Sequence, residues 1–143
     1  MSYPMPAALA DYPFIYWVEV RFRDLDMLAH VNNAVYATYF ESARLAYYQL
    51  LTGKALAAID IILAEITITY RAPAVFGDQL AVGVRVASIG TKSFVMEYAV
   101  YRGGTEQLIA SGRSVLVMYD YGVGKSIPVP ASFRVAVGKQ NGE

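Results

Sequence analysis

The stretch NAVYATYFESARLAYYQLL, from Asn33 to Leu51, carries the longest helical pattern in the chain. Apolar residues recur in it at spacings of three and four, which places them in one stripe along a helix. The stripe consists of Val35, Tyr39, Ala43, Ala46 and Leu50, widened by Tyr36, Phe40 and Tyr47. The pattern predicts about five turns of helix, with Asn32 or Asn33 as the N-terminal cap and Gly53 at the end.

Strand patterns lie on both sides of this helix. They run from Tyr16 to Arg23, from Ala64 to Pro73, from Gly77 to Gly90, from Phe94 to Val100 and from Leu108 to Tyr119. The later connections are short, which favours antiparallel pairing, and the helix must bury its apolar side against the sheet. We therefore predict an α+β fold in which an antiparallel sheet of about five strands wraps around one long central helix. After Pro130 we expect only a short helical turn.

Length and composition argue against several classes of protein. A chain of 143 residues fits a single domain, spanning residues 1–143. Its 12 basic residues balance 12 acidic ones, so no net field attracts nucleic acid or an anionic membrane. No apolar run approaches the roughly 20 residues of a membrane span, residues 1–10 lack a signal-peptide pattern, and there is no cysteine. We expect a cytoplasmic protein that buries part of its 56% hydrophobic residues in a subunit interface.

Two motifs resemble a known family. The segment from Asp24 to Glu41 resembles the D-x-D-x-x-x-H-V-N-N-x-x-Y-x-x-Y-F-E motif of the hydroxybenzoyl-CoA thioesterase branch of hotdog-fold proteins. The segment from Tyr70 to Asp78 resembles the Y-x-x-P-x-x-x-G-D motif that follows the helix in that family. The resemblance implies a hotdog-fold acyl-CoA thioesterase that needs no cofactor or metal. It also implies a homodimer or a homotetramer, a dimer of dimers, with active sites at the shared interface.

The resemblance places the catalytic carboxylate on Asp26. A carboxylate can take a proton from the attacking water or attack the thioester itself to give a mixed anhydride, and the sequence leaves both routes open. Backbone N–H groups between Val31 and Val35 would hold the oxyanion, helped by the helix dipole. Many relatives have glycine where this chain has Ala29, so a positive φ there would strain the backbone.

Other candidate residues each have a structural alternative. His30 and Asn32 join Asp26 as candidate catalytic residues, but His30 could simply bond within the loop and Asn32 could cap the helix. The candidate substrate-binding residues are Val31, Asn33, Tyr36, Arg71 and Lys92. Tyr36 could instead be a core aromatic, and the basic residues, with Arg85 and Arg102, could be ordinary surface charge. Asp24 and Asp26 would point to the same side of an extended chain, where Asp24 is better explained as structural.

Several other classes of protein fit poorly. One histidine and no cysteine leave only carboxylates for a metal site, and no G-x-S-x-G motif of a serine hydrolase occurs. Within the same fold, a dehydratase or hydratase would carry its histidine and acid in different patterns. A hotdog protein that binds acyl-CoA without hydrolysing it stays open as the alternative, and neither motif specifies the acyl group.

Overall fold

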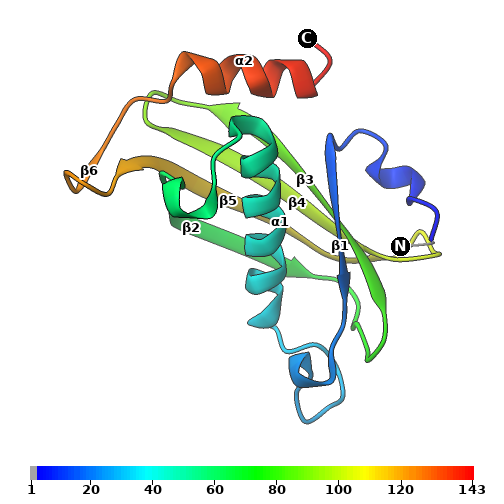
Figure 1. Cartoon of the computed structure of the whole chain (residues 1–143). Coiled ribbons are helices and arrows are strands. Elements are labelled where there is room, and N and C mark those ends of the chain that lie inside the picture. The colour runs from blue at the N-terminus through cyan, green and yellow to red at the C-terminus, as the bar shows by residue number, and fades with distance from the viewer. Residues whose placement is uncertain (1–2) are drawn as a thin grey trace.

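The computed structural model describes residues 3–143 and shows a curved sheet with one long helix lying against it (Figure 1). The strands are β1 (Phe14–Glu19), β2 (Ile61–Tyr70), β3 (Gln79–Ile89), β4 (Ser93–Arg102), β5 (Leu108–Asp120) and β6 (Lys125–Ser126). The α-helices are α1 (Val35–Thr52) and α2 (Ala131–Gln140), and the 3-10 helices are η1 (Ala7–Leu9), η2 (Phe22–Asp24) and η3 (Leu56–Ala58). The predicted α+β architecture is confirmed.

The sheet is antiparallel, with the strand order β1-β3-β4-β5-β2. The two-residue β6 pairs only with the end of β5. The register shifts between Leu63 and Glu65, between Val86 and Ser88, and between Val100 and Tyr101. Such irregularities bend strands and increase their twist, which accounts for the curvature that lets the sheet wrap around α1.

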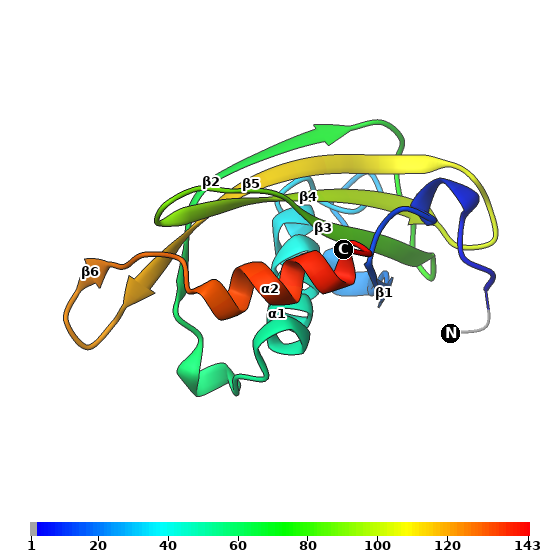
Figure 2. The same ribbon diagram turned by 90° about the horizontal axis from the view of Figure 1, so that it is seen from above.

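The helix α1 buries its aromatic side chains against the concave face of the sheet, and Figure 2 shows α1 and α2 on that same side. Phe40 stacks on Tyr98 of β4 with ring centroids 4.6 Å apart. Its ring lies directly over Gly112 of β5, where an added Cβ would come within 2.4 Å of Phe40 Cε2. A glycine in the middle of the longest strand therefore allows the helix to approach the sheet closely.

The apolar stripe of α1 is rotated from the predicted position. Leu50 is 56% exposed, whereas Arg44 and Tyr48 are buried. The Arg44 guanidinium donates to the Tyr98 hydroxyl over 3.2 Å, and its Nη2 lies 4.0 Å from the exposed Glu41 carboxylate. A hydroxyl supplied by β4 explains how a charged side chain is accommodated inside the stripe, and helical spacing alone could not reveal it.

The ends of α1 differ in how well the sequence predicted them. Gly53 ends the helix in the left-handed region, with φ 70°, as predicted. The predicted cap at Asn32 or Asn33 is wrong, because Ala34 is the N-cap and no side chain caps it. The side chain of Asn32 instead accepts the Ala34 N–H over 2.9 Å and closes the turn just before the helix.

Two further boundaries also differ. The first strand ends at Glu19 rather than Arg23, and η2 follows it. The tail after Pro130 forms the whole helix α2 instead of a short turn. Its Phe133 packs on Tyr48 and Phe94, with ring centroids 5.7 Å and 4.7 Å apart. In the part of the chain described, neither helix is long and apolar enough to cross a membrane.

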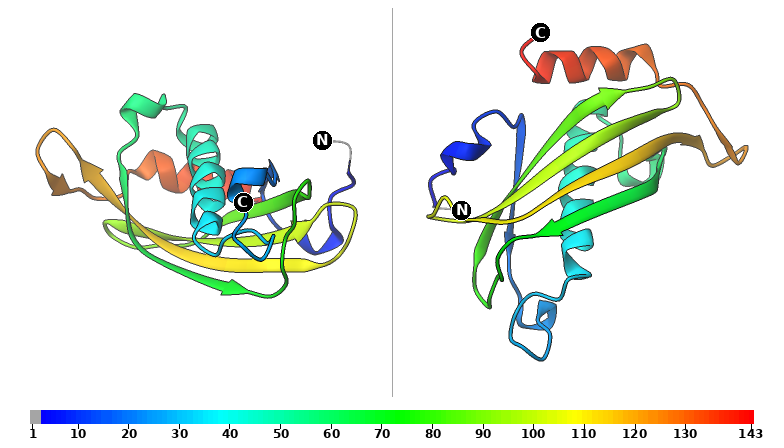
Figure 3. Two further views of the ribbon diagram at one scale, coloured as in Figure 1. Left: turned by 90° about the horizontal axis from the view of Figure 1, so that it is seen from below. Right: turned by 180° about the vertical axis from the view of Figure 1, so that it is seen from behind.

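The face of the sheet turned away from α1, here called the outer face, is partly covered by the chain itself. Leu9 and Tyr12 of the N-terminal segment lie over Gly83, within 3.0 Å of where its Cβ would be. Leu9 forms a second small core there with Ala81 and Ala99. Figure 3 shows this segment, in dark blue, beside the edge of the sheet that carries β1 and β3.

Candidate active site

A cleft of about 380 Å³ opens between the segment before α1 and the end of β2. Figure 1 shows the loop between β1 and α1 projecting beyond the sheet at this end. The cleft is lined by Asp26, Leu28, His30, Val31, Asn33 and Tyr36 on one side and by Tyr70, Arg71, Ala72 and Pro73 on the other. It brings together six of the eight site residues predicted from the sequence.

The loop that carries Asp26 is a tight turn. The Asp26 N–H donates to the His30 carbonyl over 2.8 Å, and the Ala29 N–H donates to the Asp26 carbonyl over 3.1 Å. Ala29 has φ 62° and is the only non-glycine residue in the described chain with positive φ. The positive φ that glycine would favour is therefore kept, with alanine in its place.

The two oxygens of the Asp26 carboxylate differ. Oδ1 accepts the N–H groups of Leu28 and His30, over 2.8 Å and 3.4 Å. Oδ2 receives no hydrogen bond from any described residue, and Asp26 is exposed. One oxygen thus caps the turn, as a structural role requires, and the other stays free to act on a substrate or a water molecule. The structural and the chemical roles are compatible in one side chain.

Most of the backbone N–H groups proposed for the oxyanion are already engaged. The Val31 N–H donates to Ala74 O and the Asn32 N–H to Asp24 O, each over 2.9 Å. The N–H groups of Ala34 and Val35 both bond to Asn32. Between residues 31 and 35, only the Asn33 N–H makes no hydrogen bond within the described chain. The predicted oxyanion site is therefore reduced to the Asn33 N–H and the first turn of α1.

Asp24 fastens this loop to the helix. It is buried, and its carboxylate accepts the Arg21 N–H and guanidinium at about 3.0 Å and the Tyr39 hydroxyl at 2.8 Å. Burial alone would raise its pKa, but these hydrogen bonds and the Arg21 charge hold the pKa below its ordinary value. The pKa of Tyr39 is raised, first by burial and then by its bond to Asp24. Asp24 is structural, as expected, but η2 turns it inward while Asp26 faces solvent, so the predicted shared side is wrong.

The second motif forms the opposite wall and holds the first in place. The Tyr70 hydroxyl donates to the Asn33 carbonyl over 2.9 Å, and its ring packs edge-on against Tyr36 at 5.5 Å. Tyr36 is buried at the base of the cleft, and that burial raises its pKa. Further along, Arg102 pairs with Asp78 and donates to the Pro73 carbonyl over 2.8 Å. Sequence reasoning missed Tyr70 and Arg102 as supports, although Tyr70 begins the second motif.

The remaining predicted residues lie in different places. Arg71 is exposed and lines the cleft, and the His30 side chain makes no hydrogen bond to any described residue. Asn32 lies beside the cleft, occupied with its turn. Lys92 is far away, because its carbonyl accepts the Met118 N–H, at the opposite end of the β2–β5 pair from Tyr70. One subunit alone does not bring Lys92 to this cleft.

No set of three or more histidine or carboxylate side chains within residues 3–143 is grouped so that it could hold a metal ion. The polar groups that line the cleft include the free oxygen of Asp26, the imidazole of His30, the exposed guanidinium of Arg71 and the free N–H of Asn33. A carboxylate beside a backbone donor at a helix N-terminus suits attack on a carbonyl carbon.

Comparison with known proteins identifies the superfamily of this chain. The model of the thioesterase-like superfamily matches residues 20–137, so the chain belongs to this superfamily. Its structure is a hotdog fold, and it superposes with TM-score 0.86 on a thioesterase from Thermus thermophilus complexed with coenzyme A and Zn. The two chains are 36% identical, and the match covers 94% of this chain and 98% of the other.

Two curated relatives have names that specify a type of thioester. The chain is 27% identical over 123 residues to the long-chain acyl-CoA thioesterase FadM of Escherichia coli, a match that covers 82% of this chain and 91% of FadM. It is 25% identical over 128 residues to the chloroplastic acyl-acyl carrier protein thioesterase ATL3 of Arabidopsis thaliana, covering 82% of this chain and 64% of ATL3. Thioester hydrolysis is common to these relatives, while the group that carries the acyl chain differs.

Proposed function

We propose that this protein hydrolyses acyl-CoA thioesters to the free acid and CoA, with Asp26 as the general base or nucleophile. The free Oδ2 of Asp26 is the observation that carries this proposal, because Oδ1 already holds the turn and thereby fixes the carboxylate in the cleft. The Asn33 N–H would stabilise the oxyanion, since it has no other acceptor within the described chain and lies at the positive end of α1.

The conformation of Ala29 supports hydrolysis over the alternative of a binding module without turnover. That alternative would be favoured if alanine, in place of glycine, rearranged the turn that carries Asp26. The turn is closed by two backbone hydrogen bonds with Ala29 at φ 62°. The geometry around the carboxylate is therefore retained, at a cost in backbone strain.

The test is free-thiol release from short, long and aromatic acyl-CoAs and from an acyl-acyl carrier protein, comparing the wild type with Asp26→Asn. Asparagine keeps an Oδ1 that can accept the Leu28 N–H, so the turn should survive while the carboxylate is lost. Asp11→Asn, at an exposed position on the N-terminal segment, is the matched control. We expect Asp26→Asn to lower kcat by about 100-fold or more and the control to leave it unchanged.

Two outcomes would contradict the proposal. Wild-type protein that binds acyl-CoA without releasing thiol would identify the non-catalytic module instead. Release that survives Asp26→Asn would move the chemistry to another group, and His30 would then be the first residue to replace.

Isotope labelling can identify the mixed-anhydride route. In a single turnover in H₂¹⁸O with enzyme in excess, a general base activates water, so the ¹⁸O enters the product acid. A nucleophilic Asp26 first forms a mixed anhydride and expels the CoA thiolate, and water attack on the Asp26 carbonyl then leaves ¹⁸O in the protein and an unlabelled acid. Label in the peptide containing Asp26, found by mass spectrometry, therefore identifies the anhydride, whereas label in the acid alone arises from a general base or from water attack on the acyl carbonyl of the anhydride.

The proposed substrate contacts follow from the same cleft. We expect Arg71 to bind a CoA phosphate, since it is the exposed cation of the cleft wall, and the exposed Met27 and Leu28 to border the acyl group. Within the chain described, the outer edge of β2 has no partner strand, and Ile62 and Leu63 are each 41% exposed there. Pairing of two β2 edges would give the expected homodimer, or half of a homotetramer, in the cytoplasm.

A further inference from the structure

The end of the molecule that carries the cleft also carries an exposed surface that the proposed chemistry does not use. This surface belongs to two loops, residues 20–34 between β1 and α1 and residues 71–78 between β2 and β3. Three backbone hydrogen bonds join the loops: from Val31 to Ala74, from Val20 to Asp78 and from Gly77 to Val20. Because each loop is bonded to the other, their exposed side chains keep a fixed arrangement.

Two phenylalanine rings form the apolar part of this surface. Phe22 of η2 is 78% exposed and Phe76 of the second loop is 63% exposed. Their rings meet edge to face with centroids 6.1 Å apart, and Val75 beside them is also exposed. Exposed apolar side chains that gather in one place mark an interaction site more often than single ones do. The pair is therefore a candidate contact for a binding partner.

Arginines flank these rings. Phe22 lies between Arg21 and Arg23 in sequence, and both arginines are exposed. The Arg23 guanidinium makes no hydrogen bond or ion pair with any described residue. We call Arg21, Phe22, Arg23, Val75 and Phe76 the rim patch.

The acidic side chains of the two loops do not balance the arginines at the surface. Asp24 is buried and Asp78 is half-buried, and each is paired with an arginine. Asp26, the candidate catalytic carboxylate, is the single exposed acid of residues 20–34 and 71–78. The exposed cations of the same residues are Arg21, Arg23 and Arg71. A chain without net charge thus has a locally positive end.

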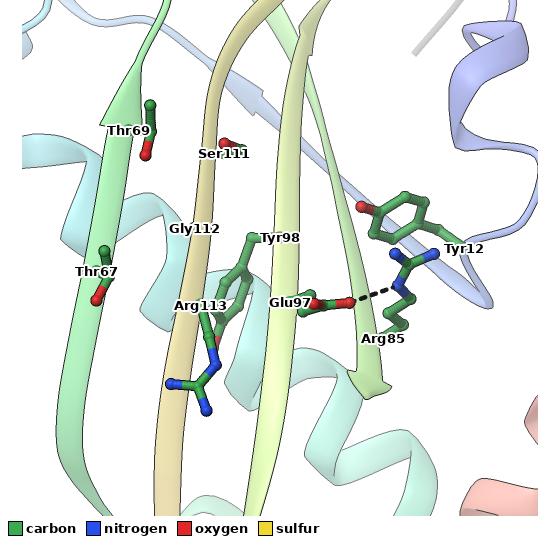
Figure 4. A pocket seen from close by; sticks show the side chains of 9 residues that line it. All are labelled: Tyr12, Thr67, Thr69, Arg85, Glu97, Tyr98, Ser111, Gly112 and Arg113. Carbon is green, nitrogen blue, oxygen red and sulfur yellow. Dashed lines mark hydrogen bonds and ion pairs between the residues drawn. The ribbon is translucent and has the colours of Figure 1, made fainter. Parts of the chain in front are cut away.

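The outer face of the sheet has no such surplus of charge. It contains a hollow of about 270 Å³, shown in Figure 4, where Arg85 Nε donates to Glu97 Oε1 over 3.0 Å. Arg113 lies 3.6 Å from Glu65 on the neighbouring strand. Opposite charges neutralise each other there, whereas the rim patch leaves Arg23 without a partner in the part of the chain described.

The composition of the rim patch indicates a protein partner. Aromatic and arginine side chains are enriched in protein interfaces and lysine is depleted there, and neither loop contains a lysine. A lipid surface fits less well. If two β2 edges pair antiparallel, the rim patches of the two copies lie at opposite ends of the dimer, so a flat bilayer could contact only one of them. The positive charge further selects an acidic partner.

We propose that the rim patch binds an acidic acyl carrier protein, which brings the acyl group into the cleft as a thioester on its phosphopantetheine arm. This inference rests on the proposed hydrolysis of thioesters. Water cleaves the thioester to the free acid and the thiol of the arm, as it does with CoA. Residues 26–31 and 71–73 of the same two loops line the cleft, so a protein bound to Phe22 and Phe76 would deliver its arm beside Asp26.

A comparison of two carriers tests the contact. The acyl group that is released fastest from the CoA panel is offered both on CoA and on a bacterial acyl carrier protein. We expect Arg23→Glu and Phe76→Ala each to lower kcat/KM for the acyl carrier protein about tenfold and to leave hydrolysis of acyl-CoA unchanged. Lys139→Glu and Val135→Ala, at exposed positions of α2, are the matched controls and should change neither reaction.

Binding of the unacylated carrier protein, measured by fluorescence anisotropy, tests the contact without turnover. We expect Kd to be about tenfold higher for Arg23→Glu than for the wild type, and added salt to weaken binding by the wild type more than binding by the variant. A wild type that cleaves no thioester but binds the carrier through Arg23 would refute the proposed function and keep the contact. A wild type that cleaves acyl-CoA but neither binds nor cleaves the acyl carrier protein would do the reverse.

Three other results would overturn the contact. Equal losses with both carriers would assign the rim patch to the cleft or to CoA, and variants that match the wild type with both carriers would leave it no part in recognition. Cosedimentation of the wild type, but not of Phe76→Ala, with vesicles of phosphatidylcholine and phosphatidylglycerol would identify a lipid surface instead. Circular dichroism checks the folding of each variant, and Arg23→Glu gives an independent reading if Phe76→Ala does not fold.

Discussion

Replacing Ala29 by glycine should stabilise the protein. A left-handed conformation costs an L-residue with a Cβ about 1–2 kcal/mol, and Ala29 holds φ 62° in the turn that carries Asp26. Glycine removes this strain but has more freedom in the unfolded chain, which costs roughly 0.5–1 kcal/mol. Because Ala29 is exposed, its methyl group contributes little burial. The net gain should be about 0.5–1 kcal/mol, or a rise in Tm of about 2–4 °C for a chain of this size.

Thermal unfolding followed by circular dichroism measures this gain, with Ala55→Gly as the matched control. Ala55 is also exposed and in a loop, but its φ is −71°, so glycine there relieves no strain and should lower stability. The reasoning is refuted if Ala29→Gly lowers Tm as much as Ala55→Gly does. Because glycine adopts the same left-handed conformation, the turn should keep its hydrogen bonds, and thioester hydrolysis by Ala29→Gly should match the wild type.

Gly112→Ala should lower Tm by several degrees, because the new methyl would overlap the Phe40 ring and overpacking costs roughly 1–3 kcal/mol; unchanged Tm would show that the helix can shift. The depressed pKa of Asp24 stabilises the fold above its ordinary pKa of about 3.9, and this contribution is lost as the pH falls through the lower folded-state pKa. The free energy of unfolding, measured with urea from pH 6 to pH 3, should therefore fall more steeply in the wild type than in Asp24→Asn. An equal fall in the two proteins would contradict this. Tyr70→Phe removes the bond to the Asn33 carbonyl and should lower kcat about tenfold with KM nearly unchanged, whereas a change in KM alone would assign Tyr70 to binding. Arg71→Gln should raise KM for acyl-CoA and leave kcat in place, as steady-state kinetics can show.

The sequence predicted the architecture well because its patterns are strong. The helical stripe from Val35 onward and the alternating strands leave few ways to bury the apolar side chains, and the observed sheet and helix follow from them. The boundaries were harder to predict, since they depend on contacts between distant segments. Nothing local in the tail indicates that Phe133 will find Tyr48 and Phe94, and that contact is what makes α2 a full helix.

Part of the candidate site could be predicted because several of its residues belong to one sequence motif. Asp26, His30 and Asn33 are close in sequence, so a motif that places one of them places the others. Arg71 comes from the far side of the cleft, and only the second motif linked it to the first. The prediction of Lys92 rests on its charge alone, and charge does not determine at which end of the sheet a residue lies. The engagement of four of the five N–H groups between residues 31 and 35 depends on Ala74, Asp24 and the Asn32 side chain, which no local pattern encodes.

The strand order has a consequence for how this chain reaches its native state. Among the five long strands, only β3, β4 and β5 follow one another both in sequence and in the sheet, so only they can pair through short loops. β1 and β2, the two strands nearest to α1 in sequence, occupy opposite edges of the sheet and must wait for this central meander to exist. The segment that carries Asp26 connects β1 to α1 and bonds through Val31 to Ala74, so we expect the candidate catalytic turn to take its final form only after these long-range contacts are made. We therefore expect the candidate site to form late in folding.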